Sequence, residues 1–199
     1  MNFLYYAVNG PEFGKNEIYQ CVCWVFVYNI CIFISVFLCR LRLDNMMKYI
    51  MLRCKKRKYW HKIINTIFIS GILCTILIVI PYVIIYDRIS KTIITLLTIF
   101  FGVFFASTIM QVIEKMCGMK MAYVVTAAGS IITSVLWSLG ERWAVILPWS
   151  YPMMGTYAGD TALLYRNIII QIIVTAGIWL ASEKIIEFNL EHNNGQGAV

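Results

Sequence analysis

The sequence predicts an all-α integral membrane protein with five transmembrane helices, a fold class indicated by its composition and by its long apolar runs. Of its 199 residues, 60% are hydrophobic and 14% are charged, and the mean hydropathy is +0.74. A soluble domain of this size could not bury that much apolar surface, whereas lipid accepts it. Crossing a bilayer core of about 30 Å takes roughly 20 apolar residues in a helix.

Four uncharged runs reach this length without extension, and a fifth reaches it when Asn167 and the turn through Ile186 are added. The predicted spans are Tyr19–Cys39, Ile63–Tyr86, Thr92–Ile113, Met121–Leu139 and Ile168–Ser182. They divide the chain into an N-terminal arm (1–18), a single transmembrane domain (19–186) and a tail (187–199).

The arm is rich in aromatic residues and contains Gly10–Pro11, which favours a short segment at the membrane interface. The first apolar run is too long for the core of a signal peptide and follows Glu12 and Glu17. We therefore expect this run to be retained as a transmembrane helix.

The positive charges predict the orientation. Of 17 Lys and Arg residues, nine lie in the loop 40–62, and loops with such an excess face the cytoplasm. Alternation from this loop places the N-terminus and residues 140–166 outside and the tail inside, in a plasma membrane. The net charge of +7 is concentrated in this one loop, which indicates contact with anionic lipid rather than with nucleic acid.

The basic loop begins with an amphipathic helical pattern. Leu43, Met46, Met47, Ile50, Met51 and Cys54 follow one another at helical spacing, so they form one apolar stripe. Such a stripe serves equally well for a helix lying on the membrane or for docking a cytoplasmic protein.

Residues 140–166 contain two prolines and two tryptophans between apolar runs. Pro148 and Pro152 prevent one straight helix, and tryptophan suits the lipid headgroup region. The pattern fits a re-entrant pair of short helices broken at Leu147–Pro148, since irregular backbone at membrane depth must be covered by protein. It also fits an interfacial loop with aromatic anchors.

The polar residues inside the spans are Ser, Thr, Asn and Gln, types that hydrogen-bond between helices. A run of small residues around Gly129 predicts close helix packing. The sequence contains no HExxH, GxSxG or GxxxxGK[ST] motif, no CxxC pair, and no histidine within a span. We therefore expect no catalytic site, nucleotide site, metal or other cofactor in this chain.

Two stretches carry a resemblance to a known family. "LDNMMKYIMLRCKKRKYW" resembles the cytoplasmic coupling region, and "LPWSYPM" the external re-entrant segment, of type 2 ABC exporter permeases. The most similar group is the small permeases of lantibiotic and bacteriocin self-protection exporters. That family has six spans and a cytoplasmic N-terminal helix, so the resemblance implies that the first transmembrane helix is missing here.

The resemblance implies an exporter subunit that is not itself an enzyme. A separate cytoplasmic ABC ATPase would hydrolyse ATP, and a second permease subunit, identical or different, would complete the path for an amphipathic peptide or lipid-like cargo. The residues that would contact the ATPase are Leu43, Met46, Met47, Lys48, Ile50 and Met51. The external turn would consist of Pro148, Trp149, Ser150, Tyr151 and Pro152.

Two other interpretations remain open. One is the substrate-capturing membrane subunit of a vitamin importer, which is also small and also energised by a separate ATPase. The other is a membrane anchor or scaffold whose basic loop recruits a protein or anionic lipid.

Overall fold

A computed structural model of the chain describes residues 3–53, 56–86, 92–141, 144, 147–150, 152–153 and 161–196. Within these ranges, side chains are described except at 42–53, 56–60, 86, 92, 115, 148, 161, 164 and 182–196. The described part contains six α-helices and a short 3-10 helix, η3. Their bounds are α1 Phe3–Asn9, α2 Ile18–Arg53, α3 Lys56–Tyr86, α4 Thr92–Cys117, α5 Met119–Ser138, η3 Pro148–Ser150 and α6 Thr161–Gln196.

Four helices are long and apolar enough to cross a membrane, which confirms the multi-pass prediction. The spans are Ile18–Leu41, His61–Ile85, Ile93–Glu114 and Met119–Ser138. Each boundary lies within two residues of the predicted one. In the fifth predicted span, the apolar stretch of α6 is Tyr165–Ala181, 17 residues, or about 26 Å of helix. This stretch is shorter than the four others and ends where the described side chains end. The fifth span therefore stays a prediction.

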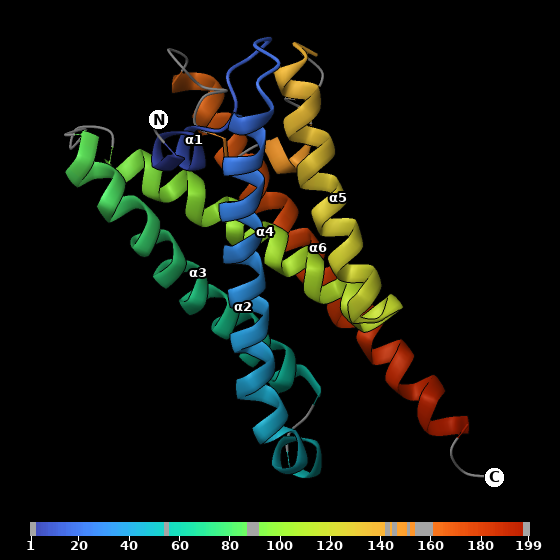
Figure 1. Cartoon of the computed structure of the whole chain (residues 1–199). Coiled ribbons are helices and arrows are strands. Elements are labelled where there is room, and N and C mark those ends of the chain that lie inside the picture. Colours follow the sequence, from blue (N-terminus) through green and yellow to red (C-terminus); the bar gives the residue numbers. More distant parts are fainter. Residues whose placement is uncertain are drawn as a thin grey trace.

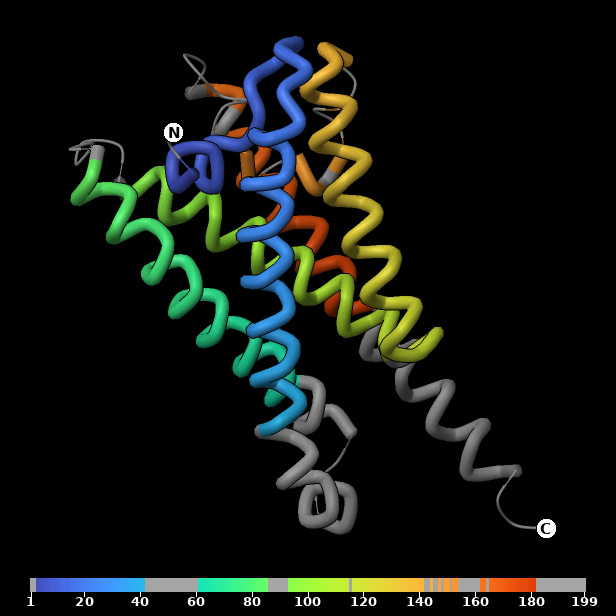
Figure 2. Tube along the Cα trace, in the orientation of Figure 1, coloured from blue at the N-terminus to red at the C-terminus, as the bar shows by residue number. Residues whose placement is uncertain are grey.

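Successive long helices run in alternating directions (Figure 1). α2 lies against α1, α3, α4 and α5, while α6 packs on α4 and α3. The chain reverses between α4 and α5 at Gly118, whose φ of 86° only glycine adopts readily. The arm and the residues after α5 therefore meet at the same end of the bundle (Figure 2).

The outer surface of the bundle is apolar. Phe26 on α2, Leu77 and Ile84 on α3, Val124 on α5 and Ile173 on α6 are more than half exposed. A soluble protein would not expose apolar side chains around its whole circumference, whereas a membrane protein presents them to lipid.

Hydroxyl groups lie inside the bundle, and most of the hydroxyls with a described bond donate back to their own helix. Thr75 Oγ1 donates to the carbonyl of Gly71 at 2.8 Å, and Thr133 Oγ1 to that of Gly129 at 2.7 Å. Bonds between helices, as expected, are also present. One is Asn29 on α2, whose Nδ2 donates to Ser130 Oγ on α5 at 2.7 Å.

The bond between Asn29 and Ser130 gives a first prediction. In a double-mutant cycle of Asn29→Ala and Ser130→Ala, we expect a coupling free energy of about 0.5–1 kcal/mol, the usual strength of such bonds in membranes. The cycle is measured by unfolding in mixed detergent micelles. Thr75→Ala is the control partner, because its hydroxyl bonds only within α3, and its coupling to Asn29 should be zero. Equal coupling in both cycles would contradict the assignment.

Candidate functional site: a segment inserted into the helix bundle

The proline-containing segment after α5 lies between helices. Trp149 contacts Gly129 of α5, and Pro152 contacts Gly102 of α4. Gly129 is nine residues before the end of α5, and Gly102 is ten residues after the start of α4. With a helical rise of about 1.5 Å per residue, both contacts lie about 14 Å or more from the helix ends. The described part of the segment therefore descends into the bundle.

Glycine at these two positions permits the insertion. A Cβ atom at Gly129 would lie 2.7 Å from Cε2 of the Trp149 indole, and one at Gly102 would lie 2.9 Å from Cγ of Pro152. Both distances are shorter than van der Waals contact. At Gly129 the small residue makes room for the Trp149 indole rather than for another helix. Ser130 in the same run faces α2, as the predicted packing of helix on helix requires.

The segment satisfies its own backbone by tight turns. The amide of Ser150 donates to the carbonyl of Leu147 at 2.9 Å, and that of Met153 donates to the carbonyl of Ser150 at 3.0 Å. The Ser150 hydroxyl also donates to Leu147, at 2.8 Å. These bonds allow irregular backbone to lie between apolar helices without water.

The N-terminal arm covers the inserted segment. Gly10 has a φ of 78° and contacts Met153, where a Cβ would lie 3.0 Å from the Met153 Cβ. The amides of Gly14 and Asn16 donate to the carbonyls of Trp137 and Ser138 at 3.3 and 2.9 Å. The arm thus provides partners for the last carbonyls of α5, which have none within the helix.

α1 itself is buried at Ala7 and Val8 and packs on α2 and α3. The arm was predicted to lie at the interface, and the structure adds that part of it belongs to the core of the bundle. Asn9 Nδ2 donates to the hydroxyl of Tyr82 on α3 at 3.1 Å, which joins the arm to a second helix.

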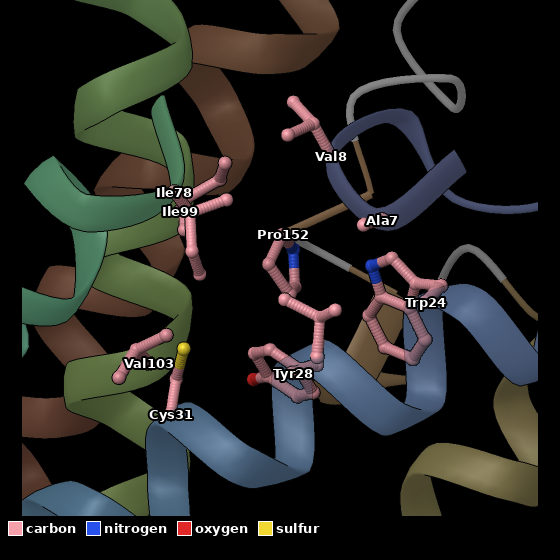
Figure 3. A pocket seen from close by; sticks show the side chains of 10 residues that line it. Ala7, Val8, Trp24, Tyr28, Cys31, Ile78, Ile99, Val103 and Pro152 are labelled. Carbon is pink, nitrogen blue, oxygen red and sulfur yellow. The ribbon is translucent and has the colours of Figure 1, made fainter. Parts of the chain in front are cut away.

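A small cavity lies where α1, α2, α3, α4 and Pro152 meet. Figure 3 shows side chains from these elements directed toward it. Its volume is about 10 Å³, and the lining residues are Ala7, Val8, Trp24, Val27, Tyr28, Cys31, Ile78, Ile99, Val103 and Pro152. This volume corresponds to no more than one water molecule, and the lining is largely apolar.

Tyr28 connects α2 to the place where the segment is inserted. Its hydroxyl donates to the carbonyl of Gly102 at 2.9 Å, and Gly102 is the residue against which Pro152 packs. The Tyr28 ring stacks on Trp24 with centroids 4.7 Å apart and planes 20° from parallel. α2, α4 and the inserted segment are therefore held together at one point.

The lining of the small cavity is uncharged. None of the cavity-lining residues is Asp, Glu, Lys, Arg or His. Among the described residues, the ion pair between Lys15 and Glu12 is on the exposed arm, where the hydrogen bond from Lys15 to Glu12 and their attraction raise the pKa of Lys15. Nowhere among the described residues do three His, Cys, Asp or Glu side chains gather at metal-binding distance.

Several polar atoms within the bundle have no hydrogen-bond partner among the described residues. They include Ser107 Oγ on α4, Thr126 Oγ1 on α5, Gln171 Oε1 on α6 and Nε1 of Trp149. An unpaired buried polar group costs about 1–3 kcal/mol. These atoms are therefore polar groups inside the bundle that the described contacts leave unpaired.

The structure brings together part of the predicted external turn. Trp149, Ser150 and Pro152 are inserted as described, Pro148 begins η3 with its side chain outside the described set, and Tyr151 lies outside the described residues. The six predicted ATPase-contacting residues belong to α2, which continues as a helix to Arg53. Only their backbone is described, and their side chains are outside the described set. These residues are Leu43, Met46, Met47, Lys48, Ile50 and Met51.

Sequence reasoning missed four residues of the site: Gly102, Tyr28, Met153 and Gly10. Gly102 stands alone among bulky residues of its span, and this isolation was a usable signal for close approach. The other three residue types are common in apolar helices and loops, so the pattern did not distinguish them.

The contact of Trp149 with Gly129 generates a second prediction. We expect Gly129→Ala to destabilise the protein by about 1–3 kcal/mol because the added methyl group overpacks the indole. Gly177→Ala in α6 is the matched control, because a Cβ there meets nothing within 4 Å, and it should be neutral or stabilising. Adding Trp149→Ala should rescue Gly129→Ala in thermal unfolding. Equal effects at both glycines would contradict the contact.

No protein-family model, no curated protein and no solved structure matches this chain.

Proposed function

We propose that this chain is a membrane-spanning permease subunit of an ATP-driven exporter, energised by a separate ATPase. The observation that carries the proposal is the placement of two features at opposite ends of the bundle. α2 extends past its apolar span to Arg53, through the stretch that carries Leu43, Met46, Met47, Ile50 and Met51, called here the methionine-rich stripe. The inserted segment enters the bundle from the other end. This pair of features is the basis of the family resemblance.

α2 provides a physical connection between the two ends. It is one helix of 36 residues, and Met47 and Tyr28 are 19 residues apart, or about 29 Å along its axis. A partner that tilts the Met47 end would move Tyr28 relative to Gly102. The inserted segment would then lose its support from α4 at Pro152.

The unpaired polar atoms support a second, more hydrated arrangement. Ser107, Thr126 and Gln171 belong to three different helices, and separation of these helices would let water reach them. The closed arrangement would then be one of two states whose balance ATP hydrolysis shifts through the partner.

The remaining parts of the proposal concern topology and cargo. Alternation from the basic loop places residues 40–62 in the cytoplasm and the inserted segment outside, with α6 as a fifth, short span. An amphipathic peptide or lipid-like cargo fits a path bordered by apolar helices, and a second permease subunit would complete that path.

A third prediction tests the ATPase contact. We expect Met47→Asp with Ile50→Asp to reduce co-purification of the ATPase at least tenfold, because two carboxylates on the apolar stripe would have to be buried in the interface. Asn45→Asp adds the same kind of charge off the stripe and should leave co-purification unchanged. The protein must remain in the membrane fraction. Unchanged capture by the double variant would reject the permease proposal in favour of a scaffold.

A fourth prediction tests the orientation. Cys117 is exposed beside the start of α5, whereas Lys15 lies by the end of α5 and its side chain is 57% exposed. The two are separated by a 20-residue helix, about 30 Å long. In intact cells, an impermeant maleimide should label Lys15→Cys in a cysteine-free background. The same reagent should label Cys117, kept as the only cysteine, after permeabilisation alone. The reverse pattern would overturn the topology.

A further inference from the structure

A groove runs along the bundle between α2 and α3. It has a volume of about 340 Å³ and is lined by Leu38, Leu41, Thr66, Ile69, Ser70 and Leu73. The four aliphatic side chains are 39–53% exposed, while Thr66 and Ser70 are buried and form the floor.

The floor of the groove accepts an apolar occupant despite its two hydroxyls. Thr66 Oγ1 donates to the carbonyl of Lys62 at 2.8 Å, and Ser70 Oγ donates to that of Ile67 at 3.0 Å. Because both donors are already satisfied, a hydrocarbon chain lying over them leaves no donor unpaired.

A cation lies at one end of this groove. Lys62 is one helical turn before Thr66 and two turns before Ile69, so the three share a face of α3. Lys62 is exposed and forms no ion pair with any residue that the structure describes. The surrounding loop 40–62 contains nine Lys and Arg residues and one carboxylate, Asp44, a net charge of +8.

The groove and Lys62 together span the depth of one leaflet of a membrane. From Lys62 to Leu73 is eleven residues, or about 16 Å of helix, and half of a hydrocarbon core of about 30 Å is about 15 Å. A lipid with its phosphate at Lys62 would therefore place an acyl chain along the whole groove.

We propose that the groove between α2 and α3 is a binding site for an anionic phospholipid, with the phosphate at Lys62 and one acyl chain over Thr66 and Ser70. The site does not depend on transport, since it is built only from a groove, a cation and a leaflet-length apolar surface. Binding would join the apolar half of α2 to the start of α3, on either side of the basic loop.

Native mass spectrometry of the full chain in detergent tests the site with dioleoylphosphatidylglycerol and dioleoylphosphatidylcholine as probes. We expect Lys62→Ala to weaken retention of the anionic lipid about fivefold, as for loss of one cation near a membrane surface, and to weaken that of the zwitterionic lipid less, because its choline offsets the phosphate charge. Lys120→Ala is the matched control, because Lys120 is an exposed cation at the start of α5. An equal loss in both variants, or none in either, would overturn the proposal.

A second variant tests the apolar part of the site. Ile69→Trp, which fills the groove, should lower retention of both lipids, and circular dichroism should show native helix content. If it instead reduces self-association of the chain and leaves lipid retention unchanged, the groove is an interface between two copies and the lipid proposal is wrong. Because the Lys62 comparison uses a surface substitution, it stays informative if Ile69→Trp does not fold.

Discussion

The absence of water from the lipid core is the constraint on which this structure depends. A chain segment that is not helical can lie at that depth only if its polar backbone is satisfied and its surface is covered by protein. The inserted segment meets the first condition through turns such as Ser150 to Leu147. It meets the second because Gly102 and Gly129 remove the side chains that would otherwise fill its place. The N-terminal arm adds the remaining cover at Gly10.

α2 unites the parts that this constraint creates. One face of the helix supports the insertion through Tyr28 and Gly102, another carries Asn29 toward α5, and a third borders the lipid-facing groove at Leu38 and Leu41. The helix is also the only described segment that joins the core of the bundle directly to the methionine-rich stripe. A displacement of α2 therefore acts on all three contacts together, which is what a coupled two-state change requires.

The four spans were predictable because crossing lipid needs a fixed number of apolar residues, and their observed ends lie within two residues of the predicted ends. The insertion was only partly predictable. Two prolines excluded a straight helix, but the depth of the segment depends on contacts with residues about twenty and fifty positions away, Gly129 and Gly102. The small residues around Gly129 predicted a contact between two helices. The sequence alone does not show that the Trp149 ring occupies the space at Gly129. For α6 the apolar count was marginal, so the fifth span rested on residues added at its ends.

The packing around Pro152, where the described residues leave only a small cavity, restricts how such a chain could move cargo. A cavity of about 10 Å³ is far smaller than the several hundred Å³ that even a drug-sized ligand occupies. A path through the chain would require the separation of Pro152, Gly102 and Tyr28 and the loss of a hydrogen bond in surroundings without water. A path along the apolar outer faces, completed by a second subunit, would not require cargo to pass between Pro152, Gly102 and Tyr28. We infer that the proposed exporter moves its cargo between two chains, with the inserted segment responding to α2 rather than forming the wall of a channel through a single chain.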